Sequence, residues 1–134
     1  MSIYNNILDT AKQMFYTIYS LKEGRENMEE NKLINSDELS NEEIKNLIYT
    51  IRGKQVMLDS DVARLYHYET RRINEAVKRN TERFPIEFCF QLTSKEYETL
   101  KSHIATSNGR GGKQKLPYVF TEKGIIMLSG LLKN

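Results

Sequence analysis

The amino-acid sequence predicts a mixed α+β domain of winged helix-turn-helix type, preceded by a separate amphipathic helix. Two short stretches with helical apolar spacing lie close together in the sequence, which is the layout of two helices joined by a tight turn. The second stretch has a basic outer side and is followed by an apolar run suited to a buried strand. Further short apolar runs flank this unit. The helical stretches are residues 59–66 and 70–83, and the strand-like runs are residues 47–52, 55–58, 88–92 and 116–120.

Length and composition set the limits for this fold. A chain of 134 residues, 39% hydrophobic and 28% charged, is long enough for one globular domain and an extension, and too short for two ordinary domains. No apolar run approaches the roughly 18 residues of a membrane span, and the first residues lack the pattern of a secretion signal. We therefore expect a cytoplasmic protein without a membrane partner.

Residues 1–24 are the first predicted element, an amphipathic helix that ends at Gly24. So short an apolar stripe is stable only when it packs against something. We expect it to pair with a second copy of the chain and form a homodimer, with packing on the chain's own domain as the alternative. Its apolar side chains recur every three or four residues, at Ile3, Ile7, Ala11, Met14, Ile18 and Leu21.

An acidic linker, residues 25–39, separates this helix from the predicted domain, residues 40–134. Residues 1–49 carry five Lys or Arg against nine Asp or Glu, whereas residues 50–134 carry fifteen against nine. Such asymmetry is typical of a basic binding domain with an acidic appendage, although an ordinary basic surface is also consistent with it.

The domain is expected to open with a short helix and a hairpin. Ser40 and Glu43 have the spacing of a capping box, which predicts the start of a helix. Gly53 and Lys54 then separate the first two strand-like runs, as the turn of a small hairpin.

Three residues carry the helix-turn-helix prediction. Two helices cross closely where a side chain is small, and the turn between them needs a residue that tolerates positive φ. The second helix must also bury a branched apolar side chain. Ala63, His67 and Ile73 occupy these three places, with histidine where glycine is the easy choice. Asp59 and Thr70 are the expected N-caps of the two helices.

The second helix is expected to run toward Arg83 and end before Phe84-Pro85. Its apolar side consists of Ile73, Ala76, Val77, Asn80 and Phe84, where Asn80 is expected to bond local backbone.

The opposite side of this helix carries the side chains that proteins use on DNA. Arg and Asn can each make two hydrogen bonds to a base edge, and Lys or Arg neutralises phosphate. A solvated face, held by pairs such as Glu75 with Arg71 or Arg79, is the alternative. The residues expected to face the major groove are Arg71, Arg72, Asn74 and Lys78, with Arg79 on phosphate.

Thr93 and Glu96 form a second capping box, which predicts a helix to about Ile104. The loop at 107–115 combines three glycines with Arg110, Lys113 and Lys115, and predicts either a wing that contacts phosphates or a flexible surface loop. Pro117 places the next strand at an edge or marks its start. Thr121 caps the last helix, 122–132, whose apolar side chains Ile125, Ile126, Leu128, Leu131 and Leu132 close the core.

The sequence contains no pattern of residues that indicates a catalytic site. Cys89 is the single cysteine and lies between two Phe residues, as a small buried side chain would, with a reactive thiol as the alternative. His67 and His103 have no partner at metal-ligand spacing. Asp59 and Asp61 are better explained by helix capping than by a nuclease site. We expect no metal, no cofactor, no small-molecule ligand and no enzyme activity.

Three longer segments resemble a known family: IRGKQVMLDSDVARLY, VKRNTERFPIEFCFQLT and ATSNGRGGKQKLPYVFTEKGIIMLS. Together they resemble the phage ORF-six N-terminal domain, of the KilA-N and Bro-N class of DNA-binding domains, over about residues 46–131. The family's Arg-Asn and Arg-Phe-Pro elements fall on Arg79-Asn80 and Arg83-Phe84-Pro85, and its Gly-Arg-Gly-Gly loop on residues 109–112. His67 replaces the family's usual turn glycine, and no attached effector region is expected in a chain that ends at Asn134.

The resemblance implies a DNA-binding module of phage regulators, often antirepressor-like. We therefore expect sequence-specific binding to double-stranded DNA, with transcription regulation in a phage or prophage setting. The rival expectation is a protein-interaction module that binds a repressor through residues 1–24 and never contacts DNA.

Overall fold

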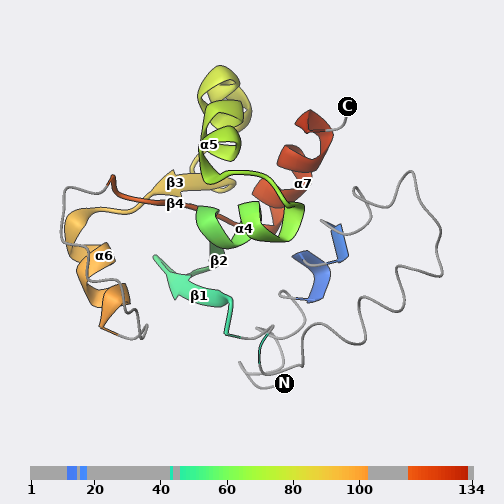
Figure 1. The fold of residues 1–134 in the computed structure, drawn as a ribbon. Helices are drawn as coiled ribbons and strands as arrows, with labels where there is room; N and C mark the ends of the chain where they lie inside the picture. The colour runs from blue at the N-terminus through green and yellow to red at the C-terminus, as the bar shows by residue number, and fades with distance from the viewer. Residues whose placement is uncertain (1–11, 15, 18–42, 44–45, 103–114, 133–134) are drawn as a thin grey trace.

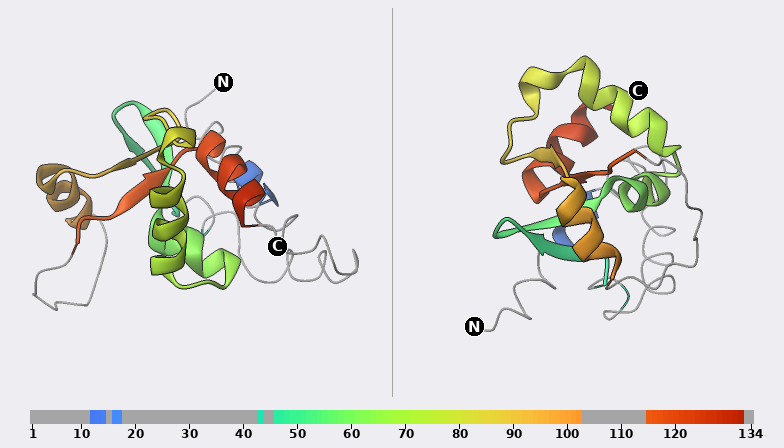
Figure 2. Two further views of the ribbon diagram at one scale, coloured as in Figure 1. Left: turned by 90° about the horizontal axis from the view of Figure 1, so that it is seen from above. Right: turned by 90° about the vertical axis from the view of Figure 1, so that its left-hand side faces the viewer.

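A computed structural model of the chain describes residues 12–14, 16–17, 43, 46–102 and 115–132. Within these ranges a four-stranded antiparallel sheet and the helices around it confirm the α+β class (Figures 1 and 2). The predicted linker, the capping box at Ser40, and the loop residues 107–114 lie outside the described residues, apart from Glu43.

The sheet has the strand order β1-β2-β4-β3. Strand β1 (Ile48–Ile51) pairs with β2 (Lys54–Leu58), which pairs with β4 (Tyr118–Phe120), which in turn pairs with β3 (Cys89–Gln91). The predicted hairpin is confirmed, but its turn consists of Arg52 and Gly53, both with positive φ (56° and 75°). Two successive positive φ values match the right-handed twist of the flanking strands, as in a type I′ turn.

Strand β4 lies inside the sheet, between β2 and β3. Pro117 immediately precedes it, so this proline marks the start of a strand and not an edge strand. Proline cannot donate a backbone hydrogen bond to a neighbour, and its position before the paired residues avoids that loss. Its carbonyl instead accepts from the N–H of Leu92 at 2.9 Å.

Helix α4 (Asp59–Tyr66) ends where the sequence predicts the turn. His67 has φ 68° and ψ 40°, in the left-handed region. The N–H of His67 donates to the carbonyl of Arg64, and that of Tyr68 to the carbonyl of Ala63. This pair of bonds satisfies the last carbonyls of the helix, and it confirms His67 as the turn residue.

Helix α5 (Thr70–Arg79) follows, and the two predicted N-caps are wrong by one residue. Leu58 and Glu69 occupy the cap positions, and neither side chain makes a capping hydrogen bond. Asp59 is the first residue of α4 and is buried, because its carboxylate is bonded to other elements of the fold instead of its own helix.

The end of α5 is also earlier than expected. The α-helix stops at Arg79, and a 3-10 turn (Thr81–Arg83) continues it toward Phe84. Asn80 lies between them, and its Nδ2 donates to the carbonyl of Ala76 at 2.8 Å, which confirms its predicted role in bonding local backbone. This bond satisfies a carbonyl near the helix end and so helps to terminate the α-helix.

The remaining helices begin where predicted. In α6 (Ser94–Lys101), Thr93 and Glu96 form the reciprocal bonds of a capping box, confirming that prediction. In α7 (Glu122–Leu131), the Thr121 hydroxyl accepts from the N–H of Gly124. Ile126 was expected in the core and is 52% exposed, so that expectation is wrong. It lies one residue beyond the buried Ile125, about 100° further around the helix.

The two faces of the sheet carry two apolar clusters. The larger contains Met57, Cys89 and Phe120 from the sheet with side chains of α4, α5 and α7. The smaller contains Val56, Phe90 and Val119, which alternate with them along the strands, together with Leu100 of α6. Helices α5 and α7 therefore lie over one part of the molecule, and α6 stands apart at the other end (Figures 1 and 2).

The core contains Cys89 and Met14, for each of which the sequence left two alternatives. Cys89 is 6% exposed, and burial raises the pKa of its thiol to about 12, so it is a buried apolar side chain and not a reactive thiol. Met14 is fully buried in the larger cluster, within a segment whose described residues, 12–14 and 16–17, are helical. At Met14, the helix thus packs on the chain's own domain, the alternative to dimerisation.

Candidate nucleic-acid interface

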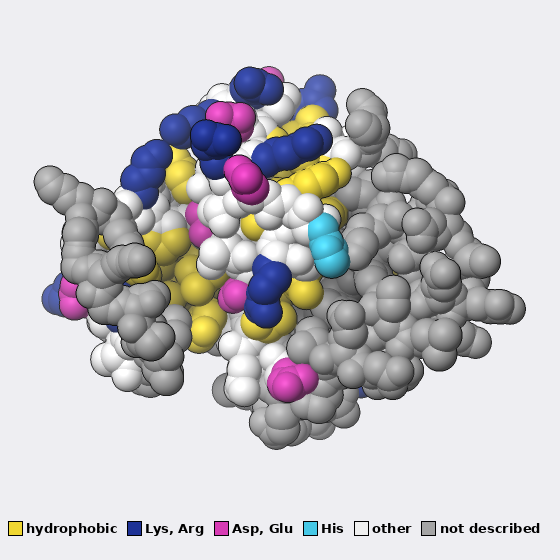
Figure 3. All heavy atoms as spheres, viewed as in Figure 1, with side chains coloured by type: hydrophobic (Ala, Val, Ile, Leu, Met, Phe, Trp, Pro, Cys, Tyr) yellow, Lys and Arg dark blue, Asp and Glu magenta, His cyan; other side chains and the backbone are white. Residues whose placement is uncertain are grey.

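Helix α5 has one side in the core and one side in solvent. Ile73 and Val77 are buried in the larger cluster, and Phe84, just beyond the helix, packs edge-on against Phe120 with ring centroids 6.2 Å apart. These anchors turn the opposite side of the helix outward. Lys and Arg side chains gather over α5 at the top of the view in Figure 3, and the exposed cations of α5 are Arg71, Arg72, Lys78 and Arg79.

Arg72 contacts an aromatic side chain of the turn before α5. Its guanidinium lies over the ring of Tyr68, with Cζ 4.3 Å from the centroid, a distance at which a cation is attracted to the ring face. Tyr68 in turn stacks on Tyr66 at 6.0 Å, and the hydroxyl of Tyr66 bonds to Ser129 Oγ at 2.6 Å. Burial raises the pKa of Tyr66 to about 12, so the phenol stays protonated at neutral pH.

This arrangement of Tyr66, Tyr68 and Arg72 was not predicted from the sequence. Tyr68 lies four residues before Arg72, a helical spacing, but it belongs to the turn and not to the helix. The contact therefore joins the turn to the helix, and the period of a single helix does not predict it. The effect is to hold the Arg72 guanidinium at the amino-terminal end of α5.

The other cations of α5 differ in whether they form ion pairs. Arg71 forms an ion pair with Glu69 at 3.5 Å, in which both side chains are more than three-quarters exposed, so water screens it. Within the described part of the chain, Lys78 and Arg79 form no ion pair, and neither does Glu75. The alternative of a helix face held by Glu75 pairs is therefore not what the structure shows.

Asn74 is placed differently from the cations. It is half-buried, and its Nδ2 donates to the Asp59 carboxylate at 3.0 Å. Its Oδ1 is buried without a hydrogen-bond partner. The amide thus faces the first residue of α4, and the structure does not bring it together with the exposed cations that were expected to share its role.

One further exposed cation follows α5 in the chain, and one cation that was predicted to bind DNA lies elsewhere in the fold. Arg83 is exposed on the 3-10 turn that follows α5, four residues after Arg79 in the chain. Lys115 is exposed on the segment that leads into β4, which Figures 1 and 2 show on the side of α6. The structure therefore does not join Lys115 to α5. Arg110 and Lys113 lie outside the described residues.

The described residues contain no group of three or more His, Cys, Asp or Glu side chains that could hold a metal ion. None of their helices has the length and apolar character needed to cross a membrane.

Comparison with known proteins identifies the family of the chain. No curated protein and no solved structure matches the chain. A family model described as the ORF6N domain matches residues 46–131, which include every described strand, α4 to α7 and all the exposed cations of α5. The match covers well over half of the chain and confirms the resemblance seen in its three sequence segments. The chain therefore belongs to the ORF6N domain family.

Proposed function

We propose that α4, the turn at His67 and α5 form a helix-turn-helix that binds double-stranded DNA through the exposed side of α5. The observation that carries this proposal is the division of α5 into a buried apolar side and an exposed side with four cations. A cationic surface of this kind suits the phosphate backbone, which supplies much of the affinity of DNA-binding proteins. Membership of the ORF6N family supports a phage or prophage regulator, acting on transcription directly or as an antirepressor.

The contacts of each side chain suggest separate roles. Arg72, held over Tyr68, and Arg71 project from the first turn of α5, the part of a recognition helix that usually contacts base edges. Lys78 and Arg79 project from the last turn and are suited to phosphates, so the proposal moves Lys78 from the groove, where it was expected, to the backbone. Asn74 enters the proposal as a residue that supports α5, because its amide is bonded to Asp59.

The proposal includes a homodimer, which would bind a palindromic site through two symmetry-related α5 helices. The partner is DNA, with no small-molecule ligand and no catalysis. The rival, in which residues 1–24 bind a repressor and DNA plays no part, is less well supported, since Met14 of this segment is already buried in the domain.

The test is a salt titration of DNA binding by fluorescence anisotropy, with the full chain and a random-sequence duplex. The logarithm of affinity should fall with the logarithm of salt concentration, by about 0.9 per phosphate neutralised. Lys78→Ala should reduce this slope by about one phosphate. Lys123→Ala is the matched control, because Lys123 is exposed on α7, outside the proposed helix-turn-helix.

Absence of binding at low salt would overturn the proposal, and so would equal effects of the two substitutions. Selection of bound sequences from a random duplex pool then tests specificity. A palindromic consensus supports the homodimer and gives the spacing of the half-sites, whereas a single half-site contradicts it.

A further inference from the structure

A second surface of the domain, remote from α5 in the fold, has an open cleft. The smaller apolar cluster is covered by α6, which among the described helices is the one that contributes side chains to it, through Tyr97 and Leu100. Among the described residues, α6 (Ser94–Lys101) covers only part of this sheet face. The result is a cleft of about 660 Å³ between β1 and α6, with Tyr49, Ile51 and Leu100 among its apolar lining.

Among the described strands, one edge of the sheet borders the cleft. Strand β1 is an edge strand, and its residues Ile-Tyr-Thr-Ile include no charge and no proline, the usual devices that block an edge. In an antiparallel pair, hydrogen-bonded and non-bonded residue pairs alternate. Ile51 and Lys54 flank the two-residue turn and form a bonded pair, so the N–H and C=O of Thr50 point outward. Thr50 is exposed.

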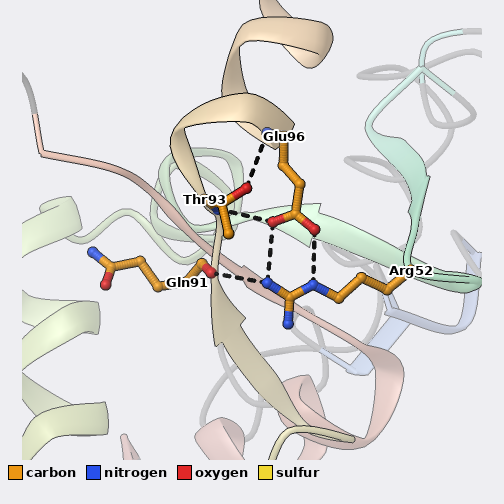
Figure 4. Close-up of polar contacts among 4 residues, drawn as sticks. All are labelled: Arg52, Gln91, Thr93 and Glu96. Carbon is orange, nitrogen blue, oxygen red and sulfur yellow. Dashed lines mark hydrogen bonds and ion pairs between the residues drawn. The ribbon is translucent and has the colours of Figure 1, made fainter.

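The opposite border is held by a charged contact (Figure 4). Arg52 donates through Nε and Nη2 to the two carboxylate oxygens of Glu96, at 2.8 Å and 3.1 Å. The same guanidinium lies over the ring of Phe90, with Cζ 4.1 Å from its centroid. Glu96 also accepts from the N–H of Thr93, as part of the capping box. These contacts tie the hairpin turn to the start of α6, so the cleft is formed before anything binds.

The Arg52–Glu96 ion pair leaves the lining of the cleft with a net positive charge. Its charged lining residues are Arg52, Lys95 and Glu96. Arg52 and Glu96 neutralise each other, whereas Lys95 is exposed and has no ion pair with a described residue. A ligand for the cleft is therefore complementary when it combines extended backbone, apolar side chains and a carboxylate.

We propose that the edge of β1 and the adjoining cleft bind an extended peptide segment of a partner protein. The peptide adds a fifth strand beside β1 through the outward groups of Thr50, a mode of recognition in which backbone bonds give affinity and side-chain pockets give specificity. An apolar side chain of the peptide enters the cleft against Tyr49, Ile51 and Leu100. An acidic side chain of the peptide lies against Lys95. This binding is independent of the DNA proposed for α5.

A second copy of this chain is a poorer occupant. Residues 46–54, which contain β1 and its turn, include Arg52 and Lys54 and no acidic residue. Pairing of two β1 strands would therefore leave Lys95 without a carboxylate from this segment. The charge pattern therefore disfavours a pair of β1 strands as the occupant.

The test uses a displayed library of random decapeptides, selected on the full chain and followed by anisotropy with the enriched peptides. The expected peptides alternate apolar and polar residues and carry Asp or Glu. Thr50→Pro should abolish their binding, because it removes an outward N–H that β2 does not use, at an edge position where proline is tolerated. Thr50→Val, which keeps this N–H, should bind as the unmodified chain does.

Charge reversal gives a second, milder variant. Lys95→Glu should weaken peptide binding by at least about threefold, whereas Lys123→Glu, with the same change of charge on α7, should not. Hydrogen exchange with bound peptide should show new protection of the Thr50 amide. The inference is overturned if no peptide is enriched, if Thr50→Pro binds as Thr50→Val does, or if the Thr50 amide gains no protection. It is also overturned if Thr50→Pro instead converts a dimer to a monomer, since the edge would then belong to a second copy.

Discussion

One carboxylate oxygen of Asp59 accepts hydrogen bonds from Asn74 Nδ2, at 3.0 Å, and from the backbone N–H of Tyr118, at 3.1 Å. Asp59 is 4% exposed, so these bonds form in the core, where the loss of a partner is costly. They join the first residue of α4 to α5 and to β4. The position of the proposed reading helix therefore depends on a buried carboxylate.

Asp59→Ala leaves both donors buried without a partner and should lower the free energy of unfolding by about 2–4 kcal/mol. Asn74→Ala should cost less, about 1 kcal/mol, because Asp59 keeps the Tyr118 bond and a buried unpaired oxygen is removed. Urea denaturation of both variants and of the double variant measures these energies. The double variant should be more stable than the sum of the single effects predicts, and strict additivity would contradict the direct bond.

His67 offers a stabilising substitution. A residue with a Cβ in the left-handed region costs roughly 1–2 kcal/mol relative to the right-handed one, and glycine has no such cost. After allowance for the greater freedom of glycine in the unfolded chain, His67→Gly should raise the free energy of unfolding by about 0.5–1 kcal/mol. His67→Val should lower it, because branched residues adopt this conformation poorly. Thermal unfolding of the two variants should give midpoints that shift in opposite directions.

Two glycines of α7 provide a matched comparison. A Cβ added at Gly124 would collide with the backbone carbonyl of Phe88, whereas one added at Gly130 would meet nothing within 4 Å. Gly124→Ala should therefore destabilise the domain by about 1–3 kcal/mol or more, as overpacking does. Gly130→Ala should stabilise it by about 0.4–1 kcal/mol, through helix propensity and a less flexible unfolded chain. Equal unfolding midpoints in urea for the two variants would contradict the close approach of α7 to Phe88.

The Arg52–Glu96 contact predicts a specific acid sensitivity. Hydrogen bonds from Arg52 and from the Thr93 N–H lower the pKa of Glu96 from 4.5 to about 2. A carboxyl whose pKa is lower in the folded state stabilises the fold above its unfolded pKa, and this stabilisation is lost as pH falls from about 4.5 toward 2. Urea midpoints measured across this range should fall less steeply in Glu96→Gln than in the unmodified chain. Glu82→Gln, at an exposed site without an ion pair to described residues, is the control and should keep the original steepness.

Features that depend on neighbouring residues were predictable from the sequence. The capping box of Thr93 and Glu96, the turn at His67 and the local bond of Asn80 each involve groups within five residues of one another. The buried side of α5 also followed from the sequence, because helical periodicity alone assigns Ile73 and Val77 to one side. For the same reason the exposed cations of α5 could be named in advance.

Other features depend on contacts between distant parts of the chain. Asp59 has the residue type and position of an N-cap, but its partners lie 15 and 59 residues away, so only the fold could assign it to them. Asn74 was predicted to lie with the exposed cations, because the helical period contains no information about its contact with α4. Ile126 is apolar and was expected in the core, yet the sheet buries only the side of α7 that includes Ile125 and Leu128.

The amino-acid sequence by itself determined the family, the order of the elements, the turn at His67 and the basic side of α5, because each follows from residue order or from the period of a single element. Only the tertiary structure decided which of the polar residues of α5 is bonded inside the fold, how Tyr68 holds Arg72, and that β1 and α6 border an open cleft. These depend on how helices and strands pack across the sheet, and residues far apart in sequence become neighbours only when that packing is complete.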